Sequence, residues 1–182
     1  MAITNPVSDF SNLEVARLGV LSLDQSTEKI GHSTWVGGEL ESYGLFEPDW
    51  PRLNETRTFV KDYLIQFASE GLTPVLVCED IYYSKNVVTY RALATLMGHL
   101  QAACFESGGL FDIVTANDAL FTLTGIKASP RNPVPRAERK KLIITEASRI
   151  AGDLLQEDIA DSVAVGWCFL KRNEKQAIPS LR

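Results

Sequence analysis

The segment "LGVLSLDQSTEKIGHSTW" (residues 18–35) joins an apolar strand to an acid, a turn and a second strand. The first strand is almost wholly apolar until it reaches Asp24, which places a charge where the chain otherwise suits a core. An ionised carboxylate is costly to remove from water unless it is paired, hydrogen-bonded or bound to a metal. Asp24 therefore either faces solvent in a turn or meets a positive partner from another part of the chain.

The rest of the chain alternates between short apolar runs and helical spacing. Phe59, Tyr63 and Phe67 recur at every fourth position, which is typical of a helix, and Gly71 ends it. The run "TPVLVCED" (residues 73–80) predicts a second buried strand that also ends in acid. The expected strands are 17–24, 29–37, 39–46, 73–80 and 110–114, and the expected helices are 51–70, 86–106, 117–125, 136–151 and 156–171.

Strands interleaved with helices predict an α/β fold, with a central mixed five-stranded sheet flanked by helices. Ligands gather outside the carboxyl ends of such strands, where Asp24 and Glu79 lie if their strands are parallel neighbours. The 182 residues, 45% apolar and 23% charged, suit one globular domain with a core. We expect a flexible extension over residues 1–16, the domain over 17–171 and a polar tail over 172–182.

The net charge of −5 argues against indiscriminate coating of a polyanion, but the charge is unevenly distributed. Residues 127–141 carry six basic side chains against one acidic side chain, so the rest of the chain carries about −10. Such a segment is either a solvated face or a surface that contacts phosphates. The basic residues are Lys127, Arg131, Arg136, Arg139, Lys140 and Lys141.

No apolar run approaches the roughly 18 residues that a membrane span requires. The N-terminal segment has no basic start followed by an apolar stretch, as a signal peptide would. Cys78, Cys104 and Cys168 lie far apart in apolar segments, which favours buried thiols over a zinc site or a disulfide scaffold. We therefore expect no membrane association and a reducing, cytoplasmic compartment.

Two further acids lie at the start of the last expected helix, in "QEDIADSVAVGW" (residues 156–167). Asp158 and Asp161 are three residues apart, so their side chains point the same way. Taken alone, these acids and Glu157 are explained as charges that complement the positive end of a helix dipole. The apolar run after Asp161 instead predicts that the start of this helix is pressed against the sheet.

Four carboxylates, those of Asp24, Glu79, Asp158 and Asp161, can thus converge at one end of the sheet. Without cations they would repel one another and raise each other's pKa values. Oxygen-only ligation of this kind suits Mg²⁺, with Mn²⁺ as a substitute, and two such ions stabilise the attacking and leaving oxygens of an in-line phosphoryl displacement. The four acids therefore predict metal-assisted phosphodiester hydrolysis with water as the nucleophile.

The order of elements and the four acids resemble the ribonuclease-H-like fold and, more closely, the RuvC-type Holliday junction resolvases. The resemblance is carried by "LGVLSLDQSTEKIG", "VCEDIYYSKN" and "EDIADSVAVG" and extends over residues 17–171. It implies that the four acids are catalytic metal ligands. Lys85 and Asn86 match the family's "KN". The resemblance also implies that Tyr82 stacks on bases and that Arg139 lies near the scissile phosphate.

We expect a DNA-binding surface beside the acids. Tyr83 joins Tyr82, Lys85, Asn86 and Arg139 there because it lies near Glu79 in the sequence, and Arg136, Lys140 and Lys141 join them because the rest of the chain is so acidic. The tyrosines have an alternative as core or rim aromatics, and the basic residues as a solvated face. A four-way junction has two strands to cut symmetrically, so the expected enzyme is a homodimer. The helix expected at 86–106 is the candidate dimer surface, although its stripe of small and large residues suits a core equally.

The expected function is a Mg²⁺-dependent endonuclease that cuts branched DNA, most of all four-way junctions, in a bacterial or phage-infected cell or an organelle with its own DNA. One alternative keeps the fold and changes the substrate, to a ribonuclease H or a flap nuclease. A second rests on "LDQST" (residues 23–27), which resembles the phosphate-binding turn of sugar kinases in the actin-like ATPase group. A third is a catalytically silent DNA-binding module.

Overall fold

The computed structural model describes residues 10, 13–26, 28–48, 53–81, 86–129 and 133–176. Within them a single five-stranded sheet has the order β3-β2-β1-β4-β5. The pairs β1–β2 and β2–β3 are antiparallel, whereas β1–β4 and β4–β5 are parallel. The mixed sheet predicted from the sequence is therefore confirmed. Its strands are β1 (Leu18–Gln25), β2 (Ile30–Val36), β3 (Glu39–Phe46), β4 (Thr73–Glu79) and β5 (Leu110–Val114).

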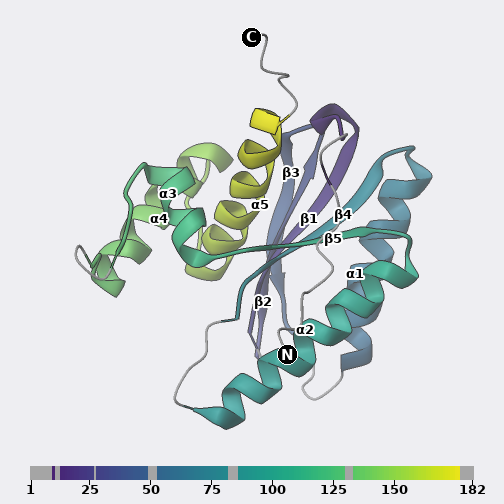
Figure 1. Cartoon of the computed structure of the whole chain (residues 1–182), viewed down its shortest axis with the longest axis horizontal. Helices are drawn as coiled ribbons and strands as arrows, with labels where there is room; N and C mark the ends of the chain where they lie inside the picture. Colours follow the sequence, from purple (N-terminus) through teal and green to yellow (C-terminus); the bar gives the residue numbers. More distant parts are fainter. Residues whose placement is uncertain are drawn as a thin grey trace.

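Helices cover both faces of the sheet, as Figure 1 shows. On one face lie α1 (Leu53–Ser69) and α2 (Val87–Glu106), and on the other lie α3 (Ala116–Thr124), α4 (Arg136–Ala151) and α5 (Glu157–Gln176). A 3₁₀ turn, η1 (Val15–Arg17), precedes β1. None of the helices in the described part of the chain is both long and apolar enough to span a membrane.

Strand alternation divides the core into two layers. On β4, Val75 and Val77 pack toward α5, and Leu76 and Cys78 pack toward α1 and α2. The three predicted buried thiols are confirmed as free and buried cysteines. The apolar stripe of α2, which includes Leu96, lies in the second layer, so it belongs to the core of this chain rather than to a free surface.

The domain extends beyond the boundaries expected from the sequence. Helix α5 continues to Gln176, because Arg172 forms an ion pair with Asp112 on β5 and the Asn173 side chain is buried. At the other end Phe10 packs edge-on against Phe169, with 5.2 Å between ring centroids. The predicted tail and extension are thus partly folded onto the core, since apolar and paired groups hold them there. Residues 1–9 and 177–182 lie outside the described residues.

Candidate active site

The parallel pairing of β1 with β4 brings two acids to one edge of the sheet. The register pairs Leu23 with Cys78, so Asp24 and Glu79 follow side by side at the carboxyl ends of the two strands. Gln25 ties these ends together, because its Nε2 donates a hydrogen bond of 2.5 Å to the backbone oxygen of Glu79. The separation of the two acids is therefore set by sheet pairing and by one side-chain bond.

The other two acids reach this edge because α5 packs unusually closely on the sheet. A Cβ at Gly31 would lie 1.9 Å from the backbone oxygen of Asp158, and a Cβ at Gly166 would lie 2.2 Å from the Trp35 indole nitrogen. Only glycine permits this approach. A hydrogen bond of 3.2 Å from Ser33 Oγ to the backbone oxygen of Ser162 fixes the helix on β2.

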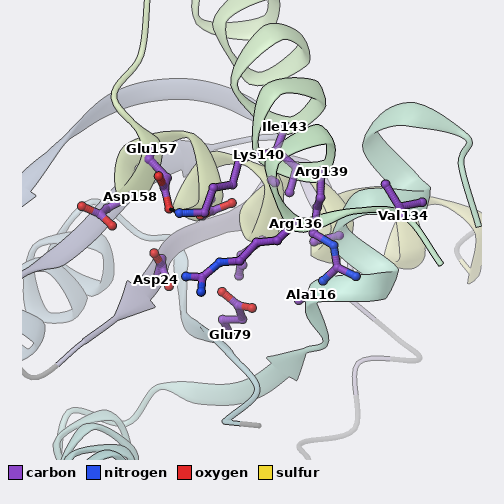
Figure 2. A pocket seen from close by; sticks show the side chains of 14 residues that line it. Asp24, Glu79, Ala116, Val134, Arg136, Arg139, Lys140, Ile143, Glu157 and Asp158 are labelled. Carbon is purple, nitrogen blue, oxygen red and sulfur yellow. Dashed lines mark ion pairs between the residues drawn. The ribbon is translucent and has the colours of Figure 1, made fainter. Parts of the chain in front are cut away.

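All four predicted acids line one pocket of about 500 Å³ at this edge. Figure 2 shows the labelled acids Asp24, Glu79, Glu157 and Asp158 around it. Asp161, one turn along α5, also lines the pocket. The convergence predicted from the sequence is therefore found, with Glu157 as a fifth carboxylate.

Burial and mutual repulsion raise the pKa values of the inner acids. Burial, then the charge of Glu79 and a hydrogen bond with it, raise the pKa of Asp24 to about 8. Burial and the charge of Asp24 raise the pKa of Asp161 to about 7. Burial also raises the pKa of Glu79, although the hydrogen bond from Asp24 opposes this. Burial and the proximity of like charges therefore disfavour the ionised forms of these acids in the absence of a cation.

Two lysines engage the acids at the start of α5. Lys29 forms an ion pair with Asp158, and Lys140 forms one with Glu157. As the side chains stand, no group of three or more His, Cys, Asp or Glu in the described residues is arranged to hold a metal ion. Ligation by three of these acids therefore requires side chains to change their positions.

The basic rim of the pocket comes from α4. Arg136, Arg139 and Lys140 line the pocket, and the Arg136 side chain extends toward Asp24 and Glu79 (Figure 2). Arg139 donates a hydrogen bond of 3.0 Å to Asn117 Oδ1, and its charge partly offsets the rise in the pKa of Glu79 that burial causes. Lys141 is exposed and does not line the pocket. Three of the four basic residues predicted on this helix thus border the acids.

The predicted contacts before α2 are described only in part. Tyr82, Tyr83 and Lys85 lie outside the described residues. Asn86 is the N-cap of α2, and its Oδ1 accepts hydrogen bonds from the backbone nitrogens of Val88 and Thr89 at 3.1 and 3.3 Å. The Asn86 side chain therefore has a structural role, and its contact with DNA stays a prediction.

Sequence reasoning did not select two residues that the structure places at the acids. Glu157 precedes Asp161 by four residues, so helical spacing alone puts both on one face, and this signal was present. Nothing in the local sequence around Lys29 indicated that it contacts the acids. Its contact with Asp158 spans 129 residues of chain and depends on how α5 packs on β2.

The sheet order, its two antiparallel and two parallel pairings and its flanking helices define a ribonuclease-H-like fold. No protein-family model matches the chain, and no curated protein sequence matches it.

Solved structures of Holliday junction resolvases share the fold at low sequence identity. Thermus thermophilus RuvC is 15% identical with a TM-score of 0.65, and a T. thermophilus RuvC structure in complex with Holliday junction substrate is 11% identical with a TM-score of 0.64. Each comparison covers 89% of this chain and 99% of the other. The Fowlpox virus resolvase with substrate Holliday junction DNA is 14% identical with a TM-score of 0.52, over 85% of this chain and 98% of the other. The chain therefore has the fold of RuvC-type resolvases.

Proposed function

We propose that this protein is a metal-dependent endonuclease that hydrolyses phosphodiester bonds in branched DNA, most of all four-way junctions. The observation that carries the proposal is the pocket itself, where five carboxylates meet beside Arg136, Arg139 and Lys140. Acids alone would repel DNA, and a basic face alone would bind it without chemistry. The two together, at the carboxyl ends of parallel strands in this fold, suit binding and hydrolysis of a phosphodiester.

The donor set fits a hard divalent cation. The pocket offers carboxylate oxygens from Asp24, Glu79, Asp158 and Asp161, without a sulfur or imidazole ligand among its lining residues. Such ligands suit Mg²⁺ or Mn²⁺, and a bound cation would favour the ionised forms of Asp24 and Asp161, whose pKa values burial and the neighbouring carboxylates raise. When bound, two such ions supply the charge that stabilises the attacking and leaving oxygens.

The residues of this chain hold and orient the DNA. Arg136 and Arg139 present guanidinium groups beside the acids, and a guanidinium matches two phosphate oxygens at once. Lys141 lies outside the pocket on the exposed side of α4, where it is suited to a phosphate further along a strand. Tyr82, Tyr83, Lys85 and Asn86 complete the proposed DNA surface.

A homodimer is part of the proposal, because a four-way junction offers two equivalent strands to a twofold-symmetric enzyme. The inner stripe of α2 is core, so a dimer contact on this helix would use its outer residues. Val87 and Val88 are 46% and 78% exposed at its start. The three free, buried cysteines suit a reducing compartment that contains DNA, as in a bacterial or phage-infected cell or an organelle with its own DNA.

The test is incubation of a labelled four-way junction with the protein and Mg²⁺, with a linear duplex of the same sequence as control. Paired nicks on opposite arms are expected on the junction, and no cutting of the duplex. An RNA–DNA hybrid and a flap substrate in parallel reactions separate the junction resolvase from a ribonuclease H or a flap nuclease. Preferential cutting of either would replace the proposed substrate.

Matched variants test the pocket directly. Glu79→Gln and Asp161→Asn should abolish cutting, whereas both proteins should still bind the junction in a gel-shift assay. Asp80→Asn is the control, because Asp80 adjoins Glu79 in sequence but is exposed and does not line the pocket. Cutting that survives both pocket substitutions would refute this active site.

A further inference from the structure

Lys29, in the turn between β1 and β2, reaches the first turn of α5 at the edge of the acidic pocket. Its ammonium forms an ion pair with Asp158 on α5, where the Asp158 side chain is only 23% exposed. Ser26 fixes the backbone of the turn, because its Oγ donates a hydrogen bond of 2.6 Å to the Lys29 oxygen and accepts one of 3.1 Å from the Lys29 nitrogen. The base of the lysine is therefore held while its side chain spans the gap to α5.

The surroundings of Lys29 are strongly acidic. The hydrogen bond with Asp158, and the charges of Asp158, Glu157 and Glu47, raise the pKa of Lys29. Glu157 forms a separate ion pair with Lys140. Both carboxylates on the first turn of α5 are thus neutralised from within the chain, and a divalent ion that used Asp158 would have to separate it from Lys29.

We propose that Lys29 is a positioning residue that competes with the divalent cation for Asp158 and keeps the DNA-free site in a state of low metal affinity. This inference rests on the proposed function, since it concerns how the same site is loaded. An ammonium and a divalent ion cannot both lie against one carboxylate without repelling each other. Loading of the site therefore requires the Lys29 side chain to leave Asp158.

DNA supplies the alternative partner for Lys29. When the Asp158 carboxylate turns toward the metal, Lys29 loses its negatively charged partner. A backbone phosphate of DNA bound at the pocket replaces that partner. Lys29 is 43% exposed, so its side chain can leave Asp158 without unfolding the turn. Binding of DNA and binding of metal then strengthen each other, and this coupling is reciprocal. An ion bound in this way is retained mainly when substrate is present.

The first experiment measures Mn²⁺ affinity of the DNA-free protein from the electron paramagnetic resonance signal of free Mn²⁺. Lys29→Gln should bind Mn²⁺ about tenfold more tightly than the wild type, because one competing charge in contact with a ligand is removed. Lys29→Arg should keep the wild-type affinity, since it retains the charge. Lys61→Gln is the matched control and should leave the Mn²⁺ affinity unchanged. Lys61 on α1 forms a similar half-exposed ion pair with Glu106 on α2, on the face of the sheet opposite α5.

A double-mutant cycle separates direct competition from a general effect of charge. With Asp158→Asn in the background, Lys29→Gln should no longer change the Mn²⁺ affinity, because the contested carboxylate is absent. An unchanged or weaker affinity in Lys29→Gln would overturn the proposal, as would undetectable Mn²⁺ binding in both proteins. An equal gain in the Asp158→Asn background would overturn it too. Thermal unfolding of each variant shows whether it is folded.

Cleavage of the junction tests the role of DNA. With junction present, wild type and Lys29→Gln should need Mg²⁺ concentrations within about twofold of each other for half-maximal cutting, because phosphate has already displaced the lysine. A tenfold difference that persisted with DNA would refute the transfer of Lys29 to phosphate. A shift in Mn²⁺ affinity without any cleavage by the wild type would refute the nuclease and leave the competition established.

Discussion

Replacement of Asp24 by asparagine should stabilise the metal-free protein at neutral pH. Burial, together with the charge of Glu79 and a hydrogen bond with it, raises the pKa of Asp24 from 3.8 to about 8 in the folded protein. Between these two values the folded protein holds a proton that the unfolded chain has released. The free energy of unfolding of the wild type therefore falls as pH rises through this window, and the slope vanishes below it, where both states are protonated.

The magnitude follows from the number of protons. One retained proton changes the free energy of unfolding by about 1.4 kcal/mol per pH unit. Asp24 and Glu79 share a hydrogen bond, so we treat the pair as retaining one proton in the folded protein. The free energy of unfolding then falls by about 2–3 kcal/mol between about pH 5 and about pH 7. Asparagine is neutral throughout and can donate to Glu79, so Asp24→Asn should escape this loss.

The assay is urea unfolding followed by tryptophan fluorescence, in EDTA, at several pH values across the window. The chain has three tryptophans, and Trp35 is buried against the α5 layer, so its emission reports the core. The stability of Asp24→Asn relative to the wild type should rise with pH, and Mg²⁺ should stabilise the wild type but not the variant at neutral pH. The variant should also lose junction cleavage.

Asp80→Asn is the control for the removal of a neighbouring acid, because Asp80 is exposed and does not line the pocket. Parallel pH profiles of wild type and Asp24→Asn would refute the account of the pocket. A lower stability of the variant at neutral pH would refute it as well, since it would mean that the Asp24 carboxylate is stabilised by the fold rather than strained by it.

Three further predictions concern the packing of α5 on the sheet and the charge of the pocket. Gly31→Ala should displace the start of α5, because its Cβ would meet the Asp158 backbone, and should lower kcat for junction cleavage at least about tenfold with junction affinity retained. Arg172→Met should cost about 2–3 kcal/mol in urea unfolding at neutral pH, since it leaves the Asp112 carboxylate buried and unpaired, and Asp112→Asn in the same chain should recover most of it. Mg²⁺ binding at about pH 6.5 should release about one proton from the raised acids of the pocket, measured by calorimetry in buffers of different ionisation enthalpy; a heat independent of the buffer would contradict this.

Local patterns were sufficient for the type and order of the elements. The apolar run that ends at Asp24 is a strand in the structure, and the spacing of Phe59, Tyr63 and Phe67 is a helix. The boundaries were less predictable at the C-terminus, where polar residues resemble a solvated tail. Arg172 pairs with Asp112, 60 residues earlier in the chain, and Asn173 is buried, so distant contacts hold this end of the helix.

The convergence of the four acids was also predictable, because it needs only that β1 and β4 are parallel neighbours and that α5 starts beside them. The two tyrosines and Lys85, which the sequence singled out with the same motif, lie outside the described residues, so their role stays a prediction. The four acids could be identified from the sequence because they stand at the ends of apolar runs or near the start of a predicted helix, and both are local patterns.

By itself the sequence determined the strands, the helices and the positions of four acids, since these depend on periodicity over a few neighbouring residues. Tertiary structure alone decided that Lys29 meets those acids. Lys29 contacts Asp158 because α5 lies directly on Gly31, and no local pattern encodes a contact between residues so far apart in the chain. The pKa values are likewise a property of the assembled pocket, because burial and the proximity of like charges exist only after distant segments have packed together.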